Sequence, residues 1–457
     1  MANTYVEYTQ TTPTDNNTWT FSCWFKRASI STEISLYAAN IDGSNQSKTR
    51  LMSDGTIQYM EYQGGSTVGK LATNRKIQDP AAWYHYVCVW DSDNGTPADR
   101  MKMYINGVRE TSFSTDTNPS SGLATNINVS GRTMQVGRDY DGGYWKGCMS
   151  HVQFVDGLAL APTEFGEFDS TSGIWKIKTG SYATPGNNGF HLKMEDASNL
   201  DLDSSSNAHT FTTSGTLTAT HDNPSNNFCT QNTAIQPLSN PWTFTNGATK
   251  QDQTASDWTS AYGTLGVTKG KWYYEAICGG TANLRYGWSS VENLAQAGAS
   301  YGPNENPFNN PALPAYGIAQ NGNIYYSSTA AANQSSSYGT DFDSSFASTY
   351  LGVYLDLDNG KLYYAYNGTI QASGVGHTLI EYLGYTFIPL LANYNADTSI
   401  NYGNGTFGST ALTGTTYSDD AGIGTFKYSP NDSGGSSFDS SAKNFYALCT
   451  KNISTYG

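Results

Sequence analysis

The chain has 457 residues, of which 14% are charged and 13% aromatic, and its formal net charge is −14. Such an excess of carboxylates repels phosphate backbones, which excludes direct nucleic-acid binding as the main function. The aromatic content also excludes a disordered chain. The 33 tyrosines and 47 glycines, with abundant Asn, Ser and Thr, indicate an all-β protein of aromatic strands and small polar turns.

Residues 1–170 are predicted to form the first domain, an antiparallel β-sandwich of the jelly-roll type. Apolar residues alternate with mostly polar ones over 19–26, which predicts a half-buried strand. The stretch 83–90 (WYHYVCVW) is apolar on both faces, as is typical of a central sandwich strand. An Asn-Gly pair inside 101–108 predicts a hairpin, and 148–157 supplies the last strand.

Residues 171–240 are rich in turn-forming residues and poor in aliphatic ones, as in GSYATPGNNG and DLDSSSNAH. This composition predicts a connector with short embedded strands at 189–194 and 209–220. An entirely flexible linker of this length is unusual, so the connector is expected to lie against the domains.

A second antiparallel β-sandwich is predicted over 241–405, followed by a Gly- and Ser-rich tail over 406–457. Its clearest element is the stretch TYLGVYLDLDNGKLYYAYNG, in which Asn359-Gly360 predicts a two-residue hairpin turn. That turn pairs Leu357 with Leu362, Leu355 with Tyr364 and Val353 with Tyr366, all on one face. The apolar face then has to pack on another sheet, because a lone hairpin is unstable in water.

Several stretches carry a resemblance to known families. WTFSCWFKR, WYHYVCVWD, MKMYINGV and YWKGCMSHVQFVDG resemble successive landmarks of laminin-G- and pentraxin-type concanavalin-like lectins. The succession GKWYYE, YGW, DLDNGKLYY, IPLL and NYG resembles the SPRY domain. The segments PTEFGEFDSTSGIWK and KNFYALCTKNI resemble structural proteins of tailed marine bacteriophages that combine both units. The resemblance implies two jelly rolls used for recognition, with ligand loops at the rim of the first.

The cysteines and the N-terminus indicate the compartment. The cysteines form no CxxC motif and mostly lie in apolar runs, which favours buried free thiols; they are Cys23, Cys88, Cys148, Cys229, Cys278 and Cys449. The start MANTYVEYTQ has no secretory signal, and no apolar run is long enough to insert into a membrane. Synthesis in a host cytoplasm together with an extracellular type of fold predicts a virion protein.

The candidate ligand site is a glycine-hinged aromatic loop that contains Tyr140, Asp141, Tyr144 and Trp145. Flat aromatic faces on a loop suit stacking against sugar rings, and the aspartate supplies hydrogen bonds. In the alternative interpretation, Tyr144 and Trp145 plug the edge of the core.

A second loop gathers the oxygen-bearing side chains of Asp91, Asp93 and Asn94. Calcium prefers such ligands, so a Ca²⁺ site is one interpretation, and no other cofactor is predicted. A plain turn with an Asx cap is the other interpretation.

No catalytic residues are predicted. Some concanavalin-like folds are glucanases with two carboxylates on one strand face. The nearest match here is Glu167-Phe168-Asp169, but Ser172 occupies the place of the last carboxylate. The histidines are scattered without zinc spacing.

Together these features predict a non-enzymatic virion structural protein, a fibre, decoration or adhesin component that presents glycan- or receptor-recognition surfaces. Its expected partners are other virion proteins, a host-surface polysaccharide and further copies of itself, with a trimer favoured. A secreted carbohydrate-binding module or adhesin is the first alternative, and a glycan-degrading enzyme the second.

Overall fold

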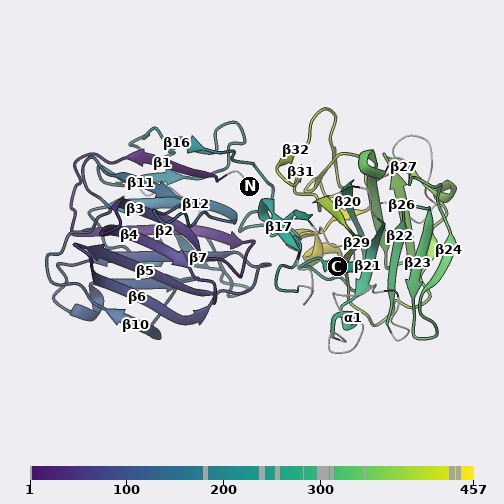
Figure 1. The fold of residues 1–457 in the computed structure, drawn as a ribbon, viewed down its shortest axis with the longest axis horizontal. Helices are drawn as coiled ribbons and strands as arrows, with labels where there is room; N and C mark the ends of the chain where they lie inside the picture. Colours follow the sequence, from purple (N-terminus) through teal and green to yellow (C-terminus); the bar gives the residue numbers. More distant parts are fainter. Residues whose placement is uncertain are drawn as a thin grey trace. The chain divides into compact units, whose positions relative to one another are not determined.

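The computed structural model describes residues 3–178, 184–235, 242–252, 258–280, 283–295, 308, 313–343, 346–431, 438 and 444–457. In this part the chain folds almost entirely into antiparallel strands (Figure 1), which confirms the all-β prediction. It divides into unit 1, Met1–Ala219 with Asn223–Ser225, and unit 2, Thr220–Asp222 with Asn226–Gly457. None of the described helices is long and apolar enough to span a membrane.

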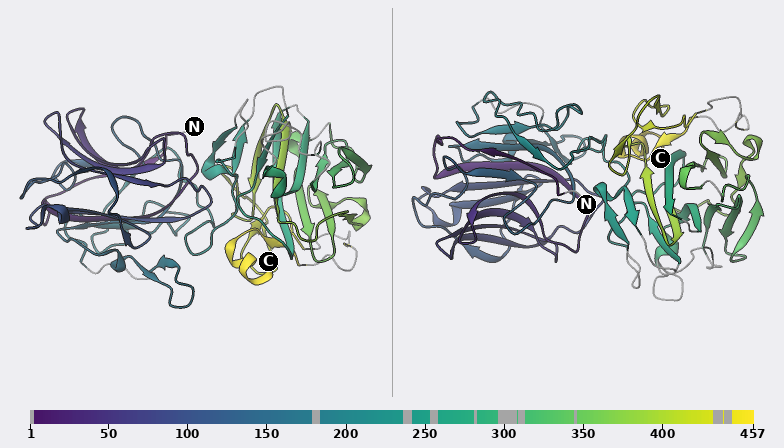
Figure 2. Two further views of the ribbon diagram at one scale, coloured as in Figure 1. Left: turned by 90° about the horizontal axis from the view of Figure 1, so that it is seen from below. Right: turned by 45° about the horizontal axis from the view of Figure 1, so that its top comes forward.

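Unit 1 is a sandwich of two sheets, whose layers are separated in the left panel of Figure 2. The eight-stranded sheet contains, in spatial order, β10 (Phe113–Thr117), β6 (Ser66–Lys76), β5 (Thr56–Gln63), β4 (Asn45–Leu51), β3 (Ile34–Asp42), β11 (Thr133–Val136), β1 (Tyr5–Thr9) and β16 (Thr212–Ser214). The six-stranded sheet contains β15 (Phe190–Leu192), β12 (Gly147–Asp156), β2 (Thr18–Arg27), β7 (Tyr84–Asp91), β8 (Met101–Ile105) and β9 (Val108–Arg109). The strands predicted from apolar alternation therefore form the centre of this second sheet.

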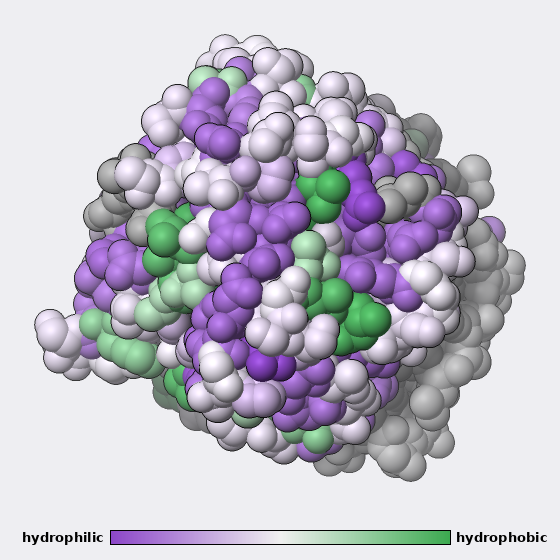
Figure 3. Space-filling model, turned by 90° about the vertical axis from the view of Figure 1, so that its left-hand side faces the viewer, coloured by the Kyte–Doolittle hydropathy of each residue, from purple (hydrophilic) through white to green (hydrophobic). Residues whose placement is uncertain are grey.

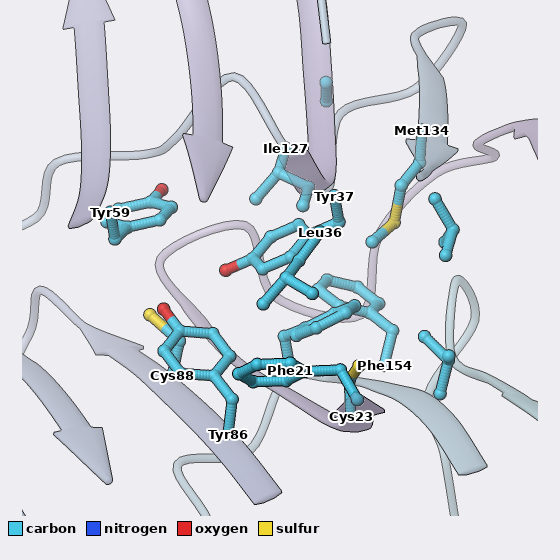
Figure 4. Packing of buried hydrophobic residues seen from close by; sticks show 14 of the residues in the cluster. Phe21, Cys23, Leu36, Tyr37, Tyr59, Tyr86, Cys88, Ile127, Met134 and Phe154 are labelled. Atoms are coloured by element: carbon cyan, nitrogen blue, oxygen red, sulfur yellow. The ribbon is translucent and has the colours of Figure 1, made fainter. Parts of the chain in front are cut away.

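Aromatic side chains fill the space between the two sheets of unit 1. In Figure 4, Tyr37 and Tyr59 of the larger sheet lie opposite Phe21 and Tyr86 of the smaller one. The rings of Phe21 and Tyr37 stack with centroids 3.7 Å apart. Stacked aromatic pairs stabilise a core beyond the area they bury, which explains the use of so many rings here.

The described residues of the predicted connector, 171–178 and 184–235, contribute to both units. β15 pairs with β12, and β16 pairs with β1 at the edge of the larger sheet. The fully buried Asn188 accepts a hydrogen bond from the Thr11 amide at 2.7 Å, and its own amide donates to Asp156 at 3.0 Å. The short strands predicted at 189–194 and 209–220 are therefore present as β15 and β16, and their partners are strands of unit 1.

Unit 2 is a second sandwich. Its larger sheet contains β17 (Thr243–Thr245), β18 (Lys250–Asp252), β30 (Ala396–Asn401), β20 (Lys271–Gly280), β25 (Tyr350–Asp356), β26 (Lys361–Tyr366) and β27 (Thr369–Ile370), with β28 (His377–Thr378) beside β26 and β35 (Tyr446–Ala447) beside β20. Its six-stranded sheet contains β19 (Trp258–Tyr262), β29 (Phe387–Tyr394), β21 (Leu284–Ser290), β22 (Ala315–Ala319), β23 (Asn323–Ser327) and β24 (Gln334–Ser337).

The remaining elements are short. They are the hairpins β13 (Gly166–Phe168) with β14 (Trp175–Ile177), β31 (Thr406–Phe407) with β32 (Thr410–Ala411) and β33 (Tyr417–Ser418) with β34 (Thr425–Phe426), the 3₁₀ turns η1 (Pro97–Asp99), η2 (Pro162–Glu164), η3 (Asn246–Ala248), η5 (Phe346–Ser348) and η6 (Ala372–Gly374), and the helices α1 (Glu292–Ala295) and α2 (Thr450–Tyr456). All six cysteines are free thiols, as predicted, although Cys148 is only half-buried.

The register predicted for the β25–β26 hairpin is wrong by two residues. Leu355 pairs with Leu362 and Val353 with Tyr364, so the turn spans four residues. The Asp356 carboxylate accepts hydrogen bonds from the backbone and side-chain amides of Asn359, at 3.0 and 2.8 Å, and these hold the longer turn. A shift of two residues preserves the faces of the strands, so the apolar face was predicted correctly.

The predicted tail is also part of unit 2. Phe426 and Phe445 pack on Tyr273 and Tyr354 on the outer side of the larger sheet, with ring centroids 4.8 and 5.0 Å apart. The sheet is therefore buried on both faces, and the tail completes the domain instead of trailing from it.

Candidate functional site

The aromatic loop lies between β11 and β12 in unit 1 and is tied back to β3. The Gly137 amide donates to the Leu36 carbonyl at 2.8 Å, and the Ser35 amide donates to the Gly143 carbonyl at 3.2 Å. Gly142 has a φ of +83°, a conformation that side chains disfavour, so the glycine permits the tight reversal of the loop. The loop is held by the sheet at both ends.

The predicted ligand residues divide into two kinds. Tyr140 is 52% exposed and presents its ring to solvent. Trp145 is half-buried, and its ring meets Phe25 edge to face with centroids 5.5 Å apart, at the border of the core. Trp145 thus has the packing of the plug interpretation, whereas Tyr140 has the exposure that a stacking residue needs.

Asp141, the third predicted residue, takes part in an ion-pair network over β4. It lies 2.5 Å from Lys48 Nζ and 2.6 Å from Arg50 Nη2. The hydrogen bond from Lys48 holds the pKa of Asp141 below its usual value. Arg50 also binds the buried Asp139, whose Oδ1 accepts the Asp141 and Gly143 amides at 3.0 Å each. These contacts order the loop.

Tyr144, the fourth predicted residue, forms an arginine–tyrosine stack with two residues that the sequence did not single out. The Arg138 guanidinium carbon lies 4.9 Å from the Tyr5 ring centre and 5.4 Å from that of Tyr144. Arg138 Nη1 also donates to the Tyr5 hydroxyl at 3.0 Å. The pairing of β1 with β11 joins residues some 130 positions apart, so adjacency in the sequence could not reveal this stack. We call Tyr5, Arg138, Tyr140, Asp141 and Tyr144 the aromatic rim.

The predicted calcium residues hold a turn after β7. The Asn94 side-chain amide donates to Asp91 Oδ2 at 3.0 Å, and Asn94 Oδ1 accepts the Thr96 amide at 3.0 Å. Asp93 Oδ2 accepts from Asn17 at 3.4 Å. These contacts are those of an Asx-type turn, the second interpretation of the loop. A calcium ion at these oxygens stays a prediction. In the described residues, no three His, Cys, Asp or Glu side chains converge as metal ligands.

The carboxylates considered for glycoside hydrolysis lie on the β13–β14 hairpin. Both Glu167 and Asp169 contact Lys176, at 3.4 and 3.1 Å. Backbone hydrogen bonds, first from Ser172, hold the pKa of Asp169 below its usual value. A general acid needs a raised pKa, so Asp169 is not suited to that role.

Parts of the chain are similar to known proteins. The profile of the concanavalin A-like lectin/glucanases superfamily matches residues 1–164. A pentraxin from Limulus polyphemus is 21% identical over 36% of this chain and 74% of its own, with a TM-score of 0.26. The SPRY domain of human HERC1 is 12% identical over 37% of this chain and 96% of its own, with a TM-score of 0.27.

A further similar structure, domains LG4-5 of the mouse laminin alpha1 chain, is 9% identical over 94% of this chain and 93% of its own, with a TM-score of 0.26. The β-sandwich of unit 1 has the concanavalin-like, laminin-G type of fold. This fold is typical of binding domains, and it is consistent with carbohydrate or receptor recognition.

Proposed function

We propose that the chain is a non-enzymatic recognition protein that binds a glycan at the aromatic rim of unit 1. The observation that carries the proposal is the exposed Tyr140 beside the Arg138–Tyr144 stack, on a loop that Asp139 holds in place. Rigid aromatic faces of this kind bind sugar rings at a small entropic cost, because the loop is ordered before the ligand arrives.

Binding without catalysis is favoured by the state of the carboxylates. Asp139 and Asp141 are neutralised by Arg50 and Lys48, and Asp169 is stabilised in its charged form. The pKa values of Asp141 and Asp169 lie below the ordinary value, and such carboxylates donate protons poorly.

As the setting, we propose a bacteriophage virion in which the protein serves as a fibre, decoration or adhesin component. The resemblance of 162–176 and 443–453 to phage structural proteins supports this setting. The protein would be present in many copies per particle, as a homo-oligomer with a trimer favoured. Several weak sites acting together then bind a host-surface polysaccharide strongly. Mass spectrometry of gradient-purified particles tests the setting, and absence of the chain from them contradicts it.

The binding function itself is tested with a panel of immobilised bacterial polysaccharides. Tyr140→Ala is expected to weaken binding of the full chain, because it removes the most exposed ring of the rim. The matched control is Tyr417→Ala, which removes a tyrosine that is 38% exposed on unit 2. Equal binding by both variants and the unaltered protein contradicts the proposal.

A further inference from the structure

Arg138 differs from the other cations around the aromatic rim. Lys48 and Arg50 are each paired with carboxylates of Asp139 or Asp141 at close range. For Arg138 the described residues supply two tyrosine rings and one tyrosine hydroxyl, but no carboxylate. Within the described ranges, the positive charge of Arg138 is therefore not neutralised by an ion pair.

The two tyrosines also fix the orientation of the guanidinium. The ring centroids of Tyr5 and Tyr144 lie 6.2 Å apart. The Arg138 guanidinium contacts both rings, and its Nη1 donates a hydrogen bond to the Tyr5 hydroxyl. Arg138 Nε is buried and has no hydrogen-bond partner in the described part of the chain. An arginine held in this way loses little conformational freedom when it binds an anion, and its planar fork matches a carboxylate or a sulfate.

We infer that the aromatic rim binds an acidic sugar, with Arg138 contacting the anionic group and Tyr140 stacking on the sugar ring. This inference rests on the proposed glycan-binding function and narrows its ligand to uronic acids or sulfated sugars. The chain as a whole is strongly acidic, with a net charge of −14, so general attraction of polyanions is not expected. Any tight binding of an acidic polysaccharide must then depend on a local site.

Figure 3 shows one face of unit 1, the left-hand side in the view of Figure 1. On the side of the molecule that faces the viewer in Figure 3, hydrophilic residues predominate and the hydrophobic ones form small separate areas. A single large apolar patch would instead indicate a protein or lipid partner.

The test measures binding of the full chain to three immobilised polymers: polygalacturonate with carboxylates, dextran sulfate with sulfates, and neutral dextran. The unaltered protein is expected to bind at least one acidic polymer, and the first two arms show which anion it prefers. Arg138→Gln should weaken that binding by about tenfold or more, because it removes a charge-assisted hydrogen bond. Arg138→Lys, which keeps the charge but loses the planar fork, should be intermediate.

The matched control is Arg109→Gln, which removes the same charge from unit 1 at a residue that pairs with Asp99 at 2.7 Å. Binding should be unchanged in this variant. Equal losses in Arg138→Gln and Arg109→Gln indicate non-specific electrostatics and overturn the inference, as does undiminished binding by Arg138→Gln.

A competition experiment on the unaltered protein covers the case in which Arg138→Gln fails to fold. Free galacturonate should displace the carboxylate polymer, or free galactose 6-sulfate the sulfated one, and free galactose should displace neither. Displacement by galactose to the same extent contradicts the inference. The protein could instead bind neutral polysaccharides only, and lose this binding in Tyr140→Ala. That outcome overturns the inference of an acidic ligand but supports the proposed glycan-binding function. Binding of no polysaccharide at all contradicts both.

Discussion

Each unit contains one fully buried glutamate that ties a distant segment to a strand, Glu61 on β5 and Glu275 on β20. Burial raises the pKa of both to about 7. The two glutamates differ in the hydrogen-bond donors around them. These donors determine how strongly a substitution by Gln should destabilise each unit.

Glu61 holds the segment before β11. Its Oε1 accepts from the Asn126 amide at 2.8 Å, from the Asn126 side chain at 2.7 Å and from Gln63 at 2.9 Å. Its Oε2 accepts only from hydroxyls, those of Ser47 and Tyr59. A hydroxyl can rotate and accept a hydrogen bond instead. The Oε2 position of Glu61 therefore tolerates an NH₂ group, as in Glu61→Gln.

Glu275 holds the tail. The backbone amide of Tyr428 donates to Oε1 at 2.7 Å, and that of Lys427 donates to Oε2 at 2.9 Å. Asn401 and Tyr273 complete the set at 3.1 Å each. A backbone N–H can only donate, so each oxygen of the ionised Glu275 faces a donor that cannot become an acceptor.

The largest predicted effect concerns the segments outside the two predicted sandwiches. A fragment 1–170 lacks β15 and β16, and a fragment 226–405 leaves Tyr273 and Tyr354 uncovered. Neither should unfold cooperatively, whereas fragments 1–225 and 226–457 should each show one cooperative thermal transition by circular dichroism. Cooperative unfolding of the short fragments would show that the added segments are dispensable.

The second prediction concerns pH. The pKa of each buried glutamate lies at about 7 in the folded protein, against an ordinary value of 4.5, so the folded state binds the proton more tightly. Their contribution to stability is complete below about pH 4.5 and is lost as pH rises through 7, by about 3 kcal/mol each. Urea denaturation from pH 5 to 8 should show that Glu61→Gln becomes more stable relative to the unaltered protein. A constant difference across this range contradicts the raised pKa.

The third prediction compares the two glutamates at one pH. At pH 8 both carboxylates are ionised in the folded protein. There Glu275→Gln should be less stable than Glu61→Gln by about 1–2 kcal/mol, because the amide at position 275 faces a backbone N–H in either orientation, whereas the amide at position 61 can donate to the two hydroxyls. Hydrogen exchange assigns each loss to its unit. Equal losses in the two variants would show that the donor type is unimportant.

The smallest predicted effect contrasts two aromatic loop residues. Trp145→Ala should lower the free energy of unfolding by about 2 kcal/mol, because the ring packs against the core. Tyr140→Ala should change it by less than about 0.5 kcal/mol, because that ring is exposed. A large loss in Tyr140→Ala would mean that the rim is structural and not available for a ligand.

The success of prediction from the sequence follows the length of each element. β2, β7 and β12 were predicted because eight to ten residues show a clear pattern. β15 and β16 were expected as short strands within 189–194 and 209–220, but the strands with which they pair were not. β35 has two residues and depends on its distant partner β20.

The arginine–tyrosine stack shows the same limit at the site. Arg138 is adjacent to the aromatic loop in the sequence, but Tyr5 joins it only through the β1–β11 pairing. The four-residue turn of β25–β26 likewise depends on the Asp356 side chain, which an Asn-Gly pattern does not reveal.

The most direct test of glycan binding at the aromatic rim is hydroxyl-radical footprinting of the full chain with and without a bound polysaccharide. If the glycan binds at the rim, the ligand lowers the oxidation of Tyr140 and Tyr144. The exposed Tyr417 of unit 2 is then oxidised at the same rate in both samples. Protection of Tyr417 with unchanged oxidation of Tyr140 would contradict binding at the rim and place the binding surface on unit 2.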